Sequence, residues 1–196
     1  MSRAIKFGAG AFLLGAMAAA CSGDDPAGAV SSTPGPSTVA DCRTSWTFDD
    51  GQLGGVEVYV GGETLTKAAD VRDFESAKAL GADVLFSEAR GNSIGVKVPL
   101  CSSGTADLTG KRISMKIYLA GPVQPDGKHY VKIRHLADQD ILVYADLEVG
   151  KWNVVDALVP ADRDATTVGA LDIDIRRNLV ADWQGTVLID DVRIAP

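Results

Sequence analysis

The last stretch of the chain, residues 185–194 with the sequence GTVLIDDVRI, constrains the fold most. Neighbouring side chains of a strand point to opposite faces, and both faces carry apolar residues here, as is typical of a strand covered on both sides. Two adjacent carboxylates, Asp190 and Asp191, stand in its middle. Buried carboxylates are costly unless hydrogen bonds, a cation or a metal compensates them. At least one therefore needs a partner, and the acidic turn WTFDDG of residues 46–51 is the natural candidate, so we expect the first and last strands to be neighbours.

The region from residue 42 onward is dominated by short alternating or apolar runs separated by Gly, Asp and Pro, and no long segment keeps a helical period. This pattern predicts an all-β domain, a β-sandwich or jelly roll of two antiparallel sheets. One short helix is expected over 73–81, where an N-cap acid, helix-forming residues and a final glycine follow one another. Strands are expected at 45–49, 56–60, 84–88, 93–100, 112–119, 130–136, 141–148, 152–159, 168–176 and 186–194.

The N-terminal part predicts export. Residues 1–20 combine two early basic residues with an apolar run that contains no acid, and the run is too short to span a bilayer of about 30 Å. Residues 21–41 are rich in Ser, Pro, Gly, Ala and Thr, so they are expected to form a flexible tether. Residues 42–196 then form one domain of ordinary size.

The segment Ala18-Ala19-Ala20-Cys21 resembles the lipobox of bacterial lipoproteins, although the family usually has Leu where Ala18 stands. The resemblance implies that the Cys21 thiol receives a diacylglyceryl group. The protein would then be exported and anchored to the bacterial cell envelope, at the outer membrane or the cell surface, with this lipid as its only membrane contact. The alternative is a simple secreted protein, because Ala18-x-Ala20 also suits an ordinary signal peptidase.

Cys42 and Cys101 remain as an even pair in a compartment that permits disulfides, so we expect a bridge between them. Such a bridge would contribute on the order of 4 kcal/mol on the chain-entropy model. The net charge of -7 becomes more negative once the basic signal is removed. This charge argues against nucleic acid as a partner and against electrostatic docking on anionic lipid.

Four motifs in order, WTFDDG, DLTGK before RISMKIYL, GKW and GTVLIDDV, resemble the jelly rolls of galactose-binding-domain-like proteins. These include carbohydrate-binding modules similar to families 4, 9, 11 and 22. The resemblance implies a structural Ca²⁺ near the two ends of the domain, and such an ion accepts irregular sets of oxygen ligands. The alternative is that the acids cap turns without a metal. The matching positions are Asp49, Asp50, Asp190 and Asp191.

Strand alternation also predicts a polar sheet face. If the strands share a sheet, three tyrosines lie among charged groups, a mixture that suits stacking on a sugar ring and bonding to its hydroxyls. The modules named above often carry tryptophan on such a face, and a solvated face with cross-strand charge pairs is an equal alternative. Trp46 and Trp152 are expected to pack in the core or at its rim, and Trp183 to close over the core. The candidate ligand-binding residues are Tyr118, Tyr130, Tyr144, Lys116, Lys132, Arg134, Asp146, Asp172 and Asp174.

Enzyme signatures such as a nucleophile elbow, zinc-ligand spacing, a phosphate loop or a dinucleotide fingerprint do not occur. Asp172 and Asp174 point the same way, as a glycosidase pair would, but Arg176 beside them favours ion pairing. We therefore predict a non-catalytic carbohydrate-binding envelope lipoprotein. A protein-interaction or structural module on the same scaffold is the alternative, and a glycan hydrolase comes third.

Overall fold

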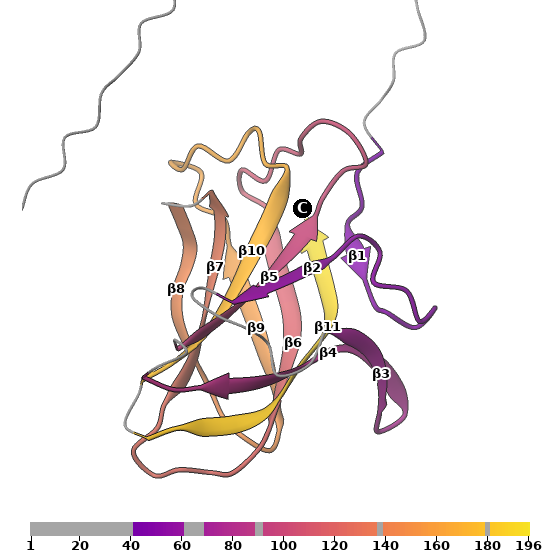
Figure 1. The fold of residues 1–196 in the computed structure, drawn as a ribbon. Coiled ribbons are helices and arrows are strands. Elements are labelled where there is room, and N and C mark those ends of the chain that lie inside the picture. Colours follow the sequence, from indigo (N-terminus) through magenta and orange to yellow (C-terminus); the bar gives the residue numbers. More distant parts are fainter. Residues whose placement is uncertain (1–40, 61–68, 89–91, 137–138, 179–180) are drawn as a thin grey trace, which may run out of the picture. The chain divides into compact units, whose positions relative to one another are not determined.

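A computed structural model describes residues 41–60, 69–88, 92–136, 139–178 and 181–196. In this part of the chain eleven strands form two antiparallel sheets, and no helix is assigned (Figure 1). The described residues thus contain no helix long and apolar enough to span a bilayer. The predicted signal, the predicted lipidation site Cys21 and nearly all of the predicted tether lie outside the described residues.

The six-stranded sheet has the order β3-β4-β11-β6-β9, and β1 pairs with β11 off this path. Its strands are β1 (Ser45–Trp46), β3 (Asp70–Phe74), β4 (Ala77–Phe86), β6 (Arg112–Ala120), β9 (Trp152–Leu158) and β11 (Trp183–Ala195). The five-stranded sheet has the order β2-β5-β10-β7-β8. Its strands are β2 (Glu57–Val60), β5 (Ser93–Pro99), β7 (His129–Leu136), β8 (Gln139–Leu147) and β10 (Ala170–Arg177).

The core lies between the two sheets and is built by simple alternation. In β6 the inward residues Ile113, Met115, Ile117 and Leu119 are almost completely buried, and their chain neighbours are half-buried or exposed. In the five-stranded sheet the inward residues are equally buried: Val131, Ile133, Leu171, Ile173 and Ile175. The all-β sandwich of two antiparallel sheets is therefore confirmed.

Strand β11 lies in the middle of its sheet, between β4 and β6. Its predicted contact with the start of the domain is confirmed, because Trp46 of β1 is opposite Val192. Val187 and Ile189 face the core, and Leu188 is also buried although it points to the outer face. The pairing with β6 shifts register between Asp190 and Arg193, where Asp191 adopts a left-handed φ of 56°.

The helix predicted over 73–81 is wrong. These residues form the end of β3, a two-residue turn at Glu75 and Ser76, and the start of β4. Glu75 takes a left-handed φ of 55° that closes the turn. Leu80, Ala82 and Val84 then alternate into the core, and burial with period two outweighs the helix propensity of the segment.

The predicted disulfide between Cys42 and Cys101 is present and joins residues 59 apart in sequence. Cys42 precedes β1 of the six-stranded sheet, and Cys101 follows β5 of the five-stranded sheet. The backbone N–H of Arg43 also donates to the carbonyl of Leu100 at 2.7 Å. The bridge therefore ties the two sheets together covalently at one end of the sandwich.

Trp183, the first residue of β11, closes over the core, as predicted. Its indole stacks on Phe86 with ring centroids 5.7 Å apart and donates to the carbonyl of Pro122 at 2.9 Å. His129 packs against the same indole, and neither of its ring nitrogens has a hydrogen-bond partner among the described residues. Burial, with the charge of Arg177 as a second cause, lowers the pKa of His129 to about 4.

Candidate functional site

The outer face of the five-stranded sheet carries a row of alternating charges. Glu57 of β2 lies opposite Lys97 of β5, Lys97 opposite Asp172 of β10, and Asp172 opposite Arg134 of β7. The Lys97 ammonium is 3.6 Å from the Glu57 carboxylate. Each charge thus has neighbours of opposite sign on the adjacent strands, which is the favourable cross-strand arrangement.

The next row along the strands contains an aromatic ring laid over a glycine. Tyr59 of β2 is opposite Gly95 of β5, and Gly95 is opposite Asp174 of β10. A Cβ added to Gly95 would lie 2.2 Å from Cζ of Tyr59, so the ring reaches across the space that the missing side chain leaves. The tyrosine keeps 38% of its surface exposed. It therefore presents an aromatic surface next to the row of charges.

Tyr59 was missed in the sequence analysis, although a signal was present. In the segment Glu57-Val58-Tyr59-Val60 the polar and apolar residues alternate, and this alternation places Tyr59 on the same face as Glu57. The pKa of the Tyr59 hydroxyl is raised, mainly by burial and next by the negative charge of Asp172. A hydrogen bond to Asp172 acts in the same direction and links the ring to the charged row.

Asp174 organises the basic side chains of this face. Its carboxylate accepts from Nη2 of Arg134 at 3.1 Å and from Nε of Arg176 at 2.7 Å, and only 3% of the residue is exposed. Ion pairing, which the sequence favoured over a glycosidase pair, is therefore what the structure has at Asp174. Asp174 holds two guanidiniums in place and leaves little carboxylate surface of its own.

The structure brings seven of the nine candidate ligand-binding residues to this sheet and adds Tyr59, Glu57, Lys97 and Arg176. Towards the β8 edge of this sheet, Arg176 of β10 is opposite Tyr130 of β7, and Tyr130 is opposite Asp146 of β8. Tyr144 belongs to β8 of the same sheet, but its side chain lies outside the described part of the chain. The other six are Tyr130, Lys132, Arg134, Asp146, Asp172 and Asp174.

Lys116 and Tyr118 do not belong to this surface, and their assignment to one shared face was wrong. Both lie on β6, which is between β11 and β9 in the other sheet. The prediction that they point outward was right, but strand alternation does not tell which of two sheets a strand joins. Their outward side chains therefore lie on the opposite side of the sandwich.

The four aspartates of the predicted calcium site have separate environments. Asp191 pairs with Lys116, whose ammonium is 3.2 Å away, and with Arg193. Asp50 accepts the backbone N–H of Gln52 at 2.9 Å and so caps a turn. These two carboxylates match the alternative in which the acids have partners other than a metal.

The ionised carboxylate of Asp190 is disfavoured by its surroundings, and a bound cation would stabilise it. Burial is the largest cause that raises the pKa of its carboxyl, and the charges of Asp191 and Asp49 raise it further. The described residues contain no group of three carboxylate, histidine or cysteine side chains that could hold a metal ion. Asp49 and Asp190 thus fit calcium only as two side-chain donors among backbone and water oxygens, and calcium stays a prediction.

Comparison with known proteins gives the fold. No protein-family profile and no curated protein matches the chain. A solved carbohydrate-binding module, CBM28, described as specific for non-crystalline cellulose, is 14% identical with a TM-score of 0.59, covering 76% of this chain and 92% of that module. CBM27-1 of Caldicellulosiruptor saccharolyticus, solved with mannohexaose, is 19% identical with a TM-score of 0.56, covering 78% of this chain and 96% of the module.

An exo-β-agarase is also similar, with 13% identity and a TM-score of 0.56, covering 79% of this chain but 26% of the agarase. At such identities the similarity establishes the architecture alone. The chain has the β-sandwich fold of carbohydrate-binding modules, and its own function has to be argued from its own surface.

Proposed function

We propose that this domain binds carbohydrate without cleaving it, on the outer face of the five-stranded sheet. The observation that carries the proposal is the Tyr59 ring, which crosses Gly95 beside the charged row of Asp172 and Arg134. An exposed aromatic ring next to hydrogen-bonding charges suits a pyranose, whose C–H face stacks on the ring while its hydroxyls bond to the charged groups.

In this mechanism each group has one task. Tyr59 supplies the stacking surface, and Asp172 accepts hydrogen bonds from sugar hydroxyls. Arg134 and Arg176 donate to hydroxyl or ring oxygens. Asp174 keeps both guanidiniums oriented before the ligand arrives, which lowers the ordering cost of binding. Solved structures of the same fold include one bound to mannohexaose, and this supports a carbohydrate ligand.

The test is a comparison of two equal substitutions on opposite sheets. We expect Asp172→Asn to weaken the retention of the chain in affinity gels containing mannan or soluble cellulose derivatives. Asp156→Asn is the matched control, because Asp156 is an exposed, ion-paired carboxylate of β9 in the other sheet. Equal retention of the two variants would defeat the proposal. Stoichiometric recovery of one envelope protein without sugar dependence would instead favour a protein-interaction module.

We further propose that the domain acts at the cell envelope, anchored by a lipid on Cys21. The export pattern of residues 1–20 and the lipobox-like segment support this location. Cells fed a clickable palmitate analogue should label the full chain, and Cys21→Ser should remove the label and release the protein from the membrane fraction. Membrane retention that persists in Cys21→Ser would contradict the anchor.

A structural Ca²⁺ held by Asp49 and Asp190 is a further part of the proposal. This proposal is supported by the raised pKa of the Asp190 carboxyl. Burial is the largest cause, and the negative charges of Asp191 and Asp49 raise the pKa further. The ion would stabilise the contact between the first and last strands and would take no part in ligand binding.

A further inference from the structure

The outer face of the six-stranded sheet carries an aromatic cluster that lies outside the core. Tyr118 of β6 is opposite Trp152 of β9, with ring centroids 5.6 Å apart. Phe74, at the end of β3, packs on both: its ring centroid is 4.7 Å from Tyr118 and 5.7 Å from Trp152. All three side chains are half-buried, so each keeps part of its surface in contact with solvent.

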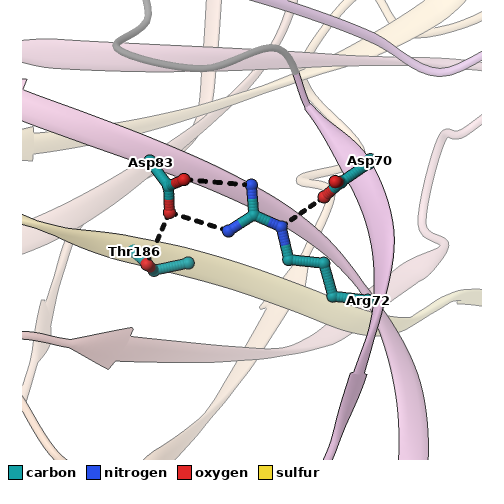
Figure 2. A network of polar contacts seen from close by, with 4 residues as sticks. All are labelled: Asp70, Arg72, Asp83 and Thr186. Carbon is teal, nitrogen blue, oxygen red and sulfur yellow. Dashed lines mark hydrogen bonds and ion pairs between the residues drawn. The ribbon is translucent and has the colours of Figure 1, made fainter.

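The β3–β4 hairpin that carries Phe74 is held on the sheet by a polar network, shown in Figure 2. Arg72 of β3 donates to Asp83 of β4 at 2.7 Å and also pairs with Asp70. Asp83 in turn accepts from the Thr186 hydroxyl of β11 at 2.7 Å. The Arg72 side chain crosses Gly81, where a Cβ would come within 2.6 Å of it. The position of Phe74 is therefore fixed by contacts that reach two further strands.

Beside this cluster is an open hollow of about 200 Å³. Trp152 lines it, and the indole N–H donates to Oε2 of Glu75 at 3.2 Å. Val154 continues the apolar surface along β9 with 74% of its surface exposed. Lys116 and Asp190 contribute an ammonium and a carboxylate to the same hollow. An aromatic surface, an apolar extension and hydrogen-bonding groups of both signs are thus combined in one place.

We propose that this hollow is a second carbohydrate site, which takes one neutral sugar unit of a glycan. The inference rests on the proposed function for the class of ligand, but on different residues and on the opposite sheet. The mixed charges favour a neutral sugar, because Glu75 would repel an anionic sugar and Lys116 would repel a cationic one. The volume is below the roughly 300–1,000 Å³ of sites for larger ligands, which points to a single unit.

The mechanism again combines stacking and hydrogen bonds. The exposed part of Trp152, with Val154 beside it, would cover the C–H face of the pyranose. Glu75 would accept from its hydroxyls, and Lys116 would donate. With two sites on opposite outer faces, one domain would hold two glycan chains or two segments of one chain, which raises avidity without a new contact.

The experiment is isothermal titration of the full chain with mannohexaose and with cellohexaose. We expect two sugars per chain for the wild type and one for Trp152→Phe, which keeps a ring in the cluster but removes the indole N–H and part of its surface. Glu75→Gly is the second variant. Glycine is favoured at the left-handed φ of 55°, so this change removes the carboxylate without straining the hairpin turn.

Tyr59→Ala separates this inference from the proposed function. Loss of one site in Tyr59→Ala and of the other in Trp152→Phe and Glu75→Gly supports both. One sugar per wild-type chain, lost in Tyr59→Ala and unchanged in Trp152→Phe and Glu75→Gly, overturns the second site and leaves the proposed function. Binding lost in Trp152→Phe and Glu75→Gly and unchanged in Tyr59→Ala supports this inference and defeats the proposed function.

Discussion

Gly95 determines whether the Tyr59 ring can lie against the five-stranded sheet. In Gly95→Ala the new methyl group would coincide with the ring, whose Cζ is 2.2 Å from the Cβ position. The ring must then turn away from Asp172, and we expect glycan affinity to fall about tenfold, or about 1.4 kcal/mol. The control is Gly169→Ala, because Gly169 has nothing within 4 Å of its Cβ position. Titration of both variants with glycan measures the change in affinity. Unchanged affinity in Gly95→Ala would refute the role of Tyr59.

His129 should make folding stability depend on pH. Its pKa is about 4 in the folded state, against about 6.5 in the unfolded chain, so the unfolded state binds a proton first as pH falls. The free energy of unfolding is therefore highest above pH 6.5 and falls between pH 6.5 and 4, by on the order of 3 kcal/mol in total. Urea unfolding of wild type and His129→Phe over this range should show the loss in the wild type alone. Parallel pH profiles of the two proteins would contradict the assignment.

At the scale of the strands, alternation predicts which side chains face inward in β6, β7 and β10. It leaves the partner strands open, and Tyr118 was therefore placed on the wrong sheet. The segment 73–81 was predicted as a helix because its residues favour one, whereas it folds as the β3–β4 hairpin and pairs with β11 only from Leu80 onward. Trp152 was expected in the core or at its rim; it lies on an outer face, opposite the outward Tyr118, and Phe74 of the β3–β4 hairpin packs on it there. Such contacts between distant segments cannot be deduced from local patterns.

The bridge between Cys42 and Cys101 is the covalent link between the strands of the two sheets. Replacing both cysteines by serine restores the freedom of a loop of 59 residues in the unfolded chain. We expect the free energy of unfolding to fall on the order of 4 kcal/mol, with glycan binding retained while the domain stays folded. Urea unfolding of the double variant measures this change. A loss well below 1 kcal/mol would mean that the chain-entropy account does not hold here.

The junction of β1 with the end of β11 is where calcium is expected to act. If Asp49 and Asp190 hold the ion, Ca²⁺ at a hundred times its dissociation constant should stabilise the fold by about 2.7 kcal/mol relative to EDTA. Asp190→Asn should lose this response. Asp107→Asn should keep it, because Asp107 is an exposed acid that caps a turn through the N–H of Thr109. Identical thermal unfolding of the wild type in Ca²⁺ and in EDTA would end the calcium proposal.

For the molecule as a whole, the balance of charge predicts the class of glycan. The chain carries a net charge of -7. Among the side chains that the structure describes, the five-stranded face combines four acidic with four basic residues: Glu57, Asp146, Asp172 and Asp174 with Lys97, Lys132, Arg134 and Arg176. A balanced face on an acidic protein offers no electrostatic attraction to a polyanion. We therefore expect retention by neutral mannan or hydroxyethyl cellulose, and weaker retention by carboxymethyl cellulose, which shares its backbone with the second polymer.

The dependence of retention on salt concentration is a second test in the same experiment. Binding to a neutral glycan depends on stacking and short hydrogen bonds, so raising the ionic strength tenfold should leave retention on hydroxyethyl cellulose nearly unchanged. On carboxymethyl cellulose the added salt screens repulsion, and retention should rise towards that of the neutral polymer. Retention that is strongest on the carboxylated polymer and falls with salt would instead assign the basic side chains, with Lys97, Lys132 and Arg134 at their centre, to an anionic glycan.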